Sequence, residues 1–271
     1  MDKEIPGSMT DEAWAGEYGF RLLDQAGAGQ GLTVRDDQQP WPWLLDAAGV
    51  ARRRGRRFRL VDSGRLDAFS LEWLAKAGAD LYTADDVRSD AEALVRIRAA
   101  GRASGAGVIF FLHGPLQAAP GEGALSREMV RELVRAGIDL HLSNRRQPRD
   151  FAALLDLAAS RRVGGGEVVY YHHGPLVKDL AELTEAGAWL HISNAKSDFT
   201  RSELPLLRDI GRKNRAAGGL VVHVDMDIEP TFLSEVRKSG AHLITNIPLG
   251  QQSLAPHIPW RAFYLDTTFL L

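Results

Sequence analysis

Histidine and aspartate recur at matching places along this chain of 271 residues. Asp62, His113, His173 and Asp225 each stand at or near the end of a short apolar run. Carboxylates and neutral imidazoles are suitable ligands for zinc, manganese or ferrous iron. We therefore predict that these four side chains bind a divalent metal, Zn, Mn or Fe. A hydrogen-bonded network of aspartates and histidines that only stabilises the fold is the alternative, because no short ligand motif such as HxH or HExxH is present.

Further polar residues follow the same apolar runs. Those predicted to act in catalysis, by moving protons or stabilising an oxyanion, are His141, His191, Asp227, Asn144 and Asn194. Those predicted to bind substrate at the mouth of the fold are Arg145, Arg146, Lys196 and Asn246, and the three cations among them could bind a carboxylate or phosphate. Lys196 lies in a predicted loop rather than on a strand, so imine chemistry is not favoured.

The elements that position these residues follow from a repeat. Apolar runs recur roughly every 25 residues and alternate with helical stretches. The eight predicted strands are Phe58–Ser63, Asp80–Ala84, Val108–His113, Asp139–Asn144, Val168–His173, Trp189–Asn194, Leu220–Asp227 and His242–Ile247. Glycines that suit left-handed helix C-caps precede every second strand, at Gly78, Gly137, Gly187 and Gly240.

Eight strand and helix units predict an α/β fold, a (β/α)8 barrel of the TIM type. An open doubly wound parallel sheet is the alternative, because periodicity alone does not show closure. In a barrel, the apolar positions face the helices, and the polar positions face a shared interior. The predicted organisation is an N-terminal helical extension at residues 1–56, the barrel at 57–247, and a C-terminal helix or tail at 248–271 that packs on the barrel.

Composition excludes several classes of protein. The chain has no cysteine, so disulfides, thiolate metal sites and a cysteine nucleophile are excluded. Its net charge of −2 favours neither nucleic acid nor a membrane surface. It has no long apolar run and no basic-then-apolar leader, which predicts a cytoplasmic protein. The apolar C-terminal tail is a candidate surface for a homo-oligomer.

Three functions follow from these residues. The first is a metal-dependent hydrolase that acts on a small polar substrate. The second is a metal-free lyase or isomerase in which histidine is the acid and the base. The third is a barrel without chemistry that binds or assembles. No nucleotide cofactor is expected, because the glycine-rich segments do not lead from a strand into a helix.

Overall fold

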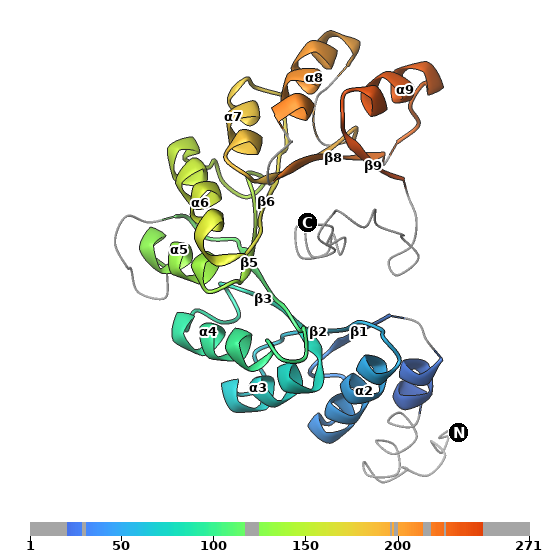
Figure 1. Cartoon of the computed structure of the whole chain (residues 1–271), viewed down its shortest axis with the longest axis vertical. Coiled ribbons are helices and arrows are strands. Elements are labelled where there is room, and N and C mark those ends of the chain that lie inside the picture. The colour runs from blue at the N-terminus through green and yellow to red at the C-terminus, as the bar shows by residue number, and fades with distance from the viewer. Residues whose placement is uncertain are drawn as a thin grey trace, which may run out of the picture. The chain divides into compact units, whose positions relative to one another are not determined.

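The structure is a computed structural model that describes residues 21–28, 31–116, 125–195, 197, 200–213, 218–224 and 226–245. Within these residues the chain alternates between strands and helices (Figure 1). The strands are β1 Leu32–Arg35, β2 Phe58–Val61, β3 Ala79–Ala84, β4 Val108–Leu112, β5 Asp139–Ser143, β6 Val168–Tyr171, β7 Trp189–Ser193, β8 Gly219–Val224 and β9 His242–Thr245. The pairings resolved between neighbouring strands are parallel.

A helix follows each strand from β1 to β8. The helices are α2 Trp41–Arg53, α3 Ala68–Ala77, α4 Ala91–Ala100, α5 Arg127–Arg135, α6 Phe151–Gly164, α7 Asp179–Glu185, α8 Leu204–Lys213 and α9 Pro230–Lys238, with a short 3₁₀ turn at Arg201–Glu203. Residues 21–27 are also helical. Side-chain caps begin several helices, as where Asp67 accepts a hydrogen bond from the Ser70 N–H. Gly78, Gly137, Gly187 and Gly240 all have positive φ, so the glycines predicted at these helix ends do adopt the left-handed conformation.

The strand order follows the chain from β1 to β9 without a reversal. A doubly wound sheet reverses its strand order at a switch point, so that alternative is excluded. Sequential parallel strands with intervening helices are the arrangement of a (β/α)8 barrel, and the predicted fold class is confirmed at the level of strand order and pairing. All eight predicted strands are present, with bounds that differ from the prediction by a few residues at most.

The ninth strand, β1, was not expected from the sequence. It lies inside residues 1–56, the segment predicted to be a helical extension, where α2 is indeed a helix. Of the four residues of β1 only Val34 is buried, and Thr33 and Arg35 are exposed. A strand this short has too few apolar positions to show a period of two. It forms because its backbone pairs with β2, with Leu32 opposite Phe58.

The chain divides into two compact units. The first comprises residues 1–82 and 96–107, and the second comprises residues 83–95 and 108–271. The first unit buries apolar side chains from α2, β2 and α3, such as Leu44, Phe58 and Leu74. In the second unit the helices α5 to α9 lie along one side of the strands (Figure 1), and Leu133 of α5 and Leu190 of β7 are fully buried. The predicted domain boundaries near residues 56 and 247 stay predictions, and the tail at 248–271 lies outside the described residues.

No helix in the described part of the chain combines the length and the apolar character needed to cross a membrane.

Candidate functional site

Asparagine side chains connect consecutive strands of the second unit at their carboxyl ends. The Asn144 Oδ1 accepts a hydrogen bond from the His173 N–H at 2.7 Å, and its Nδ2 donates to the His173 carbonyl at 2.8 Å. Asn194 makes the same pair of bonds to Met226, at 3.0 Å and 2.7 Å. Both amides therefore position the backbone that follows the next strand. Their predicted part in oxyanion stabilisation is a separate role that stays a prediction.

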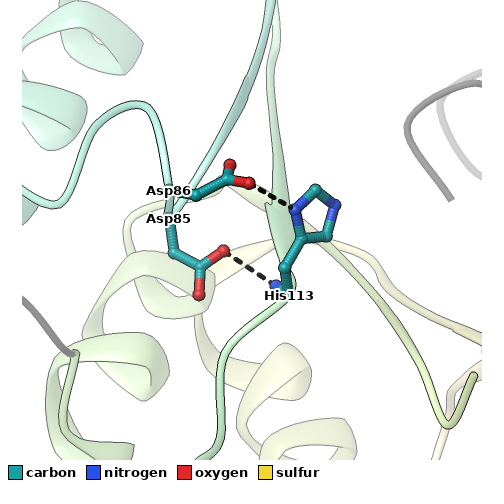
Figure 2. Close-up of side chains that lie close together, drawn as sticks. All are labelled: Asp85, Asp86 and His113. Atoms are coloured by element: carbon teal, nitrogen blue, oxygen red, sulfur yellow. Dashed lines mark hydrogen bonds and ion pairs between the residues drawn. The ribbon is translucent and has the colours of Figure 1, made fainter. Parts of the chain in front are cut away.

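Aspartate occupies the equivalent place after β3. One carboxylate oxygen of Asp85 accepts the His113 N–H at 2.8 Å (Figure 2). The other accepts the Gly114 N–H at 2.7 Å. In the first unit, Asp36 after β1 accepts the Ser63 N–H at 2.9 Å in the same way. The carboxyl end of β4 is therefore fixed by Asp85, and this contact sets the position from which the His113 side chain starts.

The imidazole of His113 meets a second carboxylate. Its Nδ1 lies 3.2 Å from the Asp86 Oδ2. Figure 2 shows the two side chains pointing toward one another. The His113 side chain is 14 % exposed, whereas the Asp86 side chain is 57 % exposed. A carboxylate that accepts the Nδ1 proton fixes the ring and selects the tautomer whose Nε2 carries the lone pair. The pair is therefore a histidine oriented by an aspartate at the edge of solvent.

The His113 ring also lines a pocket, called here the His113 pocket. Its lining residues are Leu112, His113, Ser143, Arg145, Arg146 and Arg149, and they form a small depression that is partly open to solvent, with enclosed room for about one water molecule. All six residues follow or end β4 and β5, and all belong to the second unit. The pocket therefore brings together one predicted metal ligand, His113, and two predicted substrate-binding residues, Arg145 and Arg146.

Arg149 binds the backbone around this pocket, and it was not among the residues predicted from the sequence. Its guanidinium donates to the carbonyls of Ser143 at 2.8 Å, Gly114 at 2.6 Å and Leu112 at 2.7 Å, and more weakly to that of His113 at 3.5 Å. Burial lowers the pKa of Arg149, but an arginine that is so fully hydrogen-bonded still carries its charge at neutral pH. The available signal was its position six residues after the end of β5, in the same loop as the predicted substrate-binding residues Arg145 and Arg146.

A second group of polar rings lies deeper in the sheet, called here the buried ring cluster. It consists of His141 on β5, Tyr171 on β6, His191 on β7 and His223 on β8. The His141 Nδ1 lies 3.2 Å from the Tyr171 hydroxyl, and the His191 Nδ1 lies 2.8 Å from the His223 Nε2. The Tyr171 and His191 rings are 4.6 Å apart. His141 is 0 % exposed and His191 is 1 % exposed. These two predicted catalytic histidines therefore contact other aromatic rings of the cluster and have almost no contact with solvent.

One group of three potential metal ligands occurs among the described residues. Single ligand atoms of Asp85, Asp86 and His113 lie within 4.8 Å of one another. Asp85 already has a structural role, because each of its oxygens accepts one backbone N–H group of the β4 loop, so it could bind a metal only through its remaining lone pairs. The other two candidates are one exposed carboxylate and one imidazole, which on their own are fewer than the three or four protein ligands of typical transition-metal sites. No step of a reaction is therefore derived through a metal.

The other predicted site residues are placed as follows. Asp62 belongs to the first unit, is 3 % exposed, and accepts the Gly64 N–H at 2.9 Å. His173 is tied through its backbone to Asn144, and Asp227 is exposed. Asp225, Lys196 and Asn246 lie outside the described residues. The proposed set of four metal ligands therefore stays a prediction.

Comparison with known proteins adds no assignment. No family model and no curated protein matches the sequence. Similar solved structures include 3-dehydroquinate dehydratase from Aquifex aeolicus VF5, with 14 % identity over 67 % of this chain and 83 % of that chain and a TM-score of 0.33. Deoxyribose phosphate aldolase from Aeropyrum pernix is 13 % identical over 88 % and 94 %, with a TM-score of 0.34. A mutant tryptophan synthase alpha-subunit from Pyrococcus furiosus is 13 % identical over 80 % and 87 %, with a TM-score of 0.36. Similarity at this level supports no activity.

Proposed function

We propose that this protein is an enzyme in which His113 transfers a proton to or from a small substrate bound in the His113 pocket. The observation that carries the proposal is that the His113 ring lines the pocket while its Nδ1 lies 3.2 Å from Asp86. Of the functions predicted from the sequence, this favours the metal-free lyase or isomerase. A histidine oriented by a carboxylate suits general acid–base catalysis, because its ordinary pKa is close to neutral pH.

Each neighbour of His113 has a definable part in such a reaction. Asp86 accepts the Nδ1 proton, so that the Nε2 lone pair is the base. Asp85 fixes the backbone of the β4 loop, so the ring starts from a constant position. Arg149 connects that loop to the end of β5 through the Ser143 carbonyl. Catalysis depends on holding the reacting groups within a fraction of an ångström, and these contacts supply that rigidity.

Metal-dependent hydrolysis is less well supported by the contacts. It requires His113 as a metal ligand together with side chains that can complete the coordination, and the Asp85 oxygens are engaged with backbone N–H groups. A chelator distinguishes the two functions, because acid–base catalysis by His113 persists when divalent metals are removed, whereas metal-dependent catalysis is lost.

Proton exchange in D₂O tests the proposal across several classes of substrate. Small 2-oxo acids, 2-hydroxy acids and phosphorylated ketoses are incubated with the protein, and the loss of carbon-bound protons is followed by ¹H NMR. We expect catalysed exchange with at least one compound, a loss of roughly 100-fold or more in His113→Gln, and a smaller loss in Asp86→Asn. His242→Gln, at the opposite end of the strands, is the matched control. Exchange that is equal in His113→Gln and the wild type contradicts the proposal.

A further inference from the structure

We infer that the His113 pocket recognises a small oxyanion, either a carboxylate or a phosphate group, as the part of the substrate that it holds. The inference rests on the proposed function where it calls that ligand a substrate, while the anion site itself is argued from its own contacts. Three of the six lining residues are arginines, and none of the six is acidic. Guanidinium groups bind carboxylate and phosphate through paired N–H donors.

The first contribution is a fixed positive charge. The Arg149 donors point to four backbone carbonyls, so this side chain cannot turn toward solvent or toward a ligand without breaking them. Its neighbour Tyr170 does not cancel the charge, because burial raises the pKa of Tyr170 to about 12 and the hydroxyl is neutral. Asp85 is the nearby acidic group, and its oxygens are engaged with the β4 loop. Arg149 thus shapes the pocket and makes its electrostatic potential more positive, but it does not supply hydrogen-bond donors to a ligand.

The second contribution is a pair of arginines that can donate to a ligand. The Arg145 guanidinium makes no ion pair or hydrogen bond with any residue in the described part of the chain, and the residue is exposed. The Arg146 Nη1 lies 3.8 Å from the Asp86 Oδ2, with the two side chains 51 % and 57 % exposed. An exposed ion pair at this distance contributes little stability, so Arg146 can exchange it for a ligand at small cost.

The third contribution comes from Ser143. Its Oγ accepts the Arg145 N–H at 3.1 Å, which leaves the hydroxyl proton able to donate into the pocket. The two arginines and the hydroxyl provide the donors that a carboxylate or phosphate requires. Counting Asp85 and Asp86 as well, three guanidinium groups face two carboxylates, so one positive charge remains for an anion.

Anion binding also bears on the proposed proton transfer. Asp86 is shared between Arg146 at 3.8 Å and His113 at 3.2 Å. A ligand anion that takes Arg146 leaves Asp86 to His113, which favours the orientation of the ring needed for proton transfer. The same anion places the neighbouring carbon atoms of the substrate beside the imidazole. The geometry therefore points to a small carbon acid that bears a carboxylate or a phosphate group.

Isothermal titration of the whole protein with inorganic phosphate and with malonate, at constant ionic strength, tests the anion site. We expect saturable binding of at least one probe, weakened roughly tenfold in Arg145→Gln and further in the double variant Arg145→Gln/Arg146→Gln. Arg208→Gln is the matched control, because it removes an exposed arginine on α8 and is expected to leave affinity unchanged. Binding of phosphate alone indicates a phosphorylated substrate, and binding of malonate alone indicates a carboxylic acid.

Three results would overturn the anion site: no saturable binding of either probe, equal affinity in the double variant and the wild type, or an equal loss in Arg208→Gln. The proposed function fails in a different way. Arginine-dependent binding without any His113-dependent exchange leaves the anion site in place and removes the reaction. Exchange that needs His113 but persists undiminished in the double variant keeps the reaction and removes the anion as its recognition element.

Discussion

Histidine stands in two contrasting settings within the second unit. In the His113 pocket, 14 % of the His113 side chain is exposed, and its partner Asp86 is exposed as well. In the buried ring cluster, His141 and His191 have almost no exposed surface, and their Nδ1 atoms face Tyr171 and His223. The first arrangement can meet a ligand, whereas the second has ring neighbours on adjacent strands.

The difference shows how a polar interior is to be interpreted. A buried polar group is costly unless it is hydrogen-bonded, and the Nδ1 atoms of His141 and His191 meet that need within the buried ring cluster. Polarity inside the sheet is therefore not by itself evidence of catalysis. The stronger evidence is a polar group that lies beside open space and has an oriented partner, as His113 does.

The largest effect on stability is expected inside the buried ring cluster. His191→Ala removes a fully buried ring and the 2.8 Å contact with His223, so we expect the free energy of unfolding to fall by about 3 kcal/mol. His113→Ala, in the partly open pocket, is expected to cost about 1 kcal/mol. Urea unfolding of both variants measures the contrast. Equal losses in the two variants would show that the two settings do not differ energetically.

An intermediate effect is expected for the arginines of the His113 pocket. Arg149→Lys keeps the charge but cannot donate to carbonyls of both the β4 loop and β5, so we expect a loss of about 2 kcal/mol. Arg145→Lys changes an exposed side chain and is expected to alter stability by less than about 0.5 kcal/mol. Thermal unfolding compares the two. If Arg149→Lys is as stable as the wild type, the carbonyl contacts do not fix the loop.

A smaller contrast separates the two asparagines that connect consecutive strands. Asn144→Ala loses two partly buried bonds to His173, and we expect a decrease of about 1–2 kcal/mol. Asn194→Ala loses two exposed bonds to Met226 and is expected to lose about half as much. Unfolding measurements test these values. A loss of exchange activity in Asn144→Ala with unchanged stability would instead support its predicted role as an oxyanion donor.

The fold could be predicted because its strands are buried runs with clear ends. The eight expected strands coincide with apolar segments such as Val108–Leu112 and Trp189–Ser193, and glycines in the left-handed conformation mark the helix ends before them. β1 could not be predicted in the same way, because only Val34 among its four residues is buried. Pairing with β2, rather than local pattern, makes it a strand.

The candidate site was only partly predictable. Alternation along the strands selected His113 as the last residue of a predicted strand, and the structure places it one residue past the end of β4. Its partner Asp86 was missed because it stands in the turn after β3, where alternation gives no direction. The adjacent pair Asp85 and Asp86 was the available signal, since the carboxyl ends of neighbouring parallel strands lie together. Arg149 was missed because nothing in the sequence shows which carbonyls a guanidinium will reach.

The smallest expected effect concerns His172, a buried histidine outside both groups. Its side chain approaches the Pro175 carbonyl at 2.8 Å through Nε2, and burial lowers its pKa, with bonds to the Pro175 and Gly174 backbone offsetting part of the shift. Above the unfolded pKa of about 6.5 the ring is neutral in both states and has no effect. Below that pH the unfolded chain binds a proton that the folded chain resists, so the free energy of unfolding falls until pH reaches the folded pKa.

His172→Gln therefore makes the fall of stability shallower as pH is lowered from about 6.5. Urea midpoints measured at a series of pH values for the wild type, His172→Gln and the control His242→Gln give the slopes. The control keeps the buried imidazole of His172, so only a change of slope confined to His172→Gln is assigned to that ring. If His172→Gln also keeps the wild-type slope, the acid sensitivity of the second unit comes from other groups.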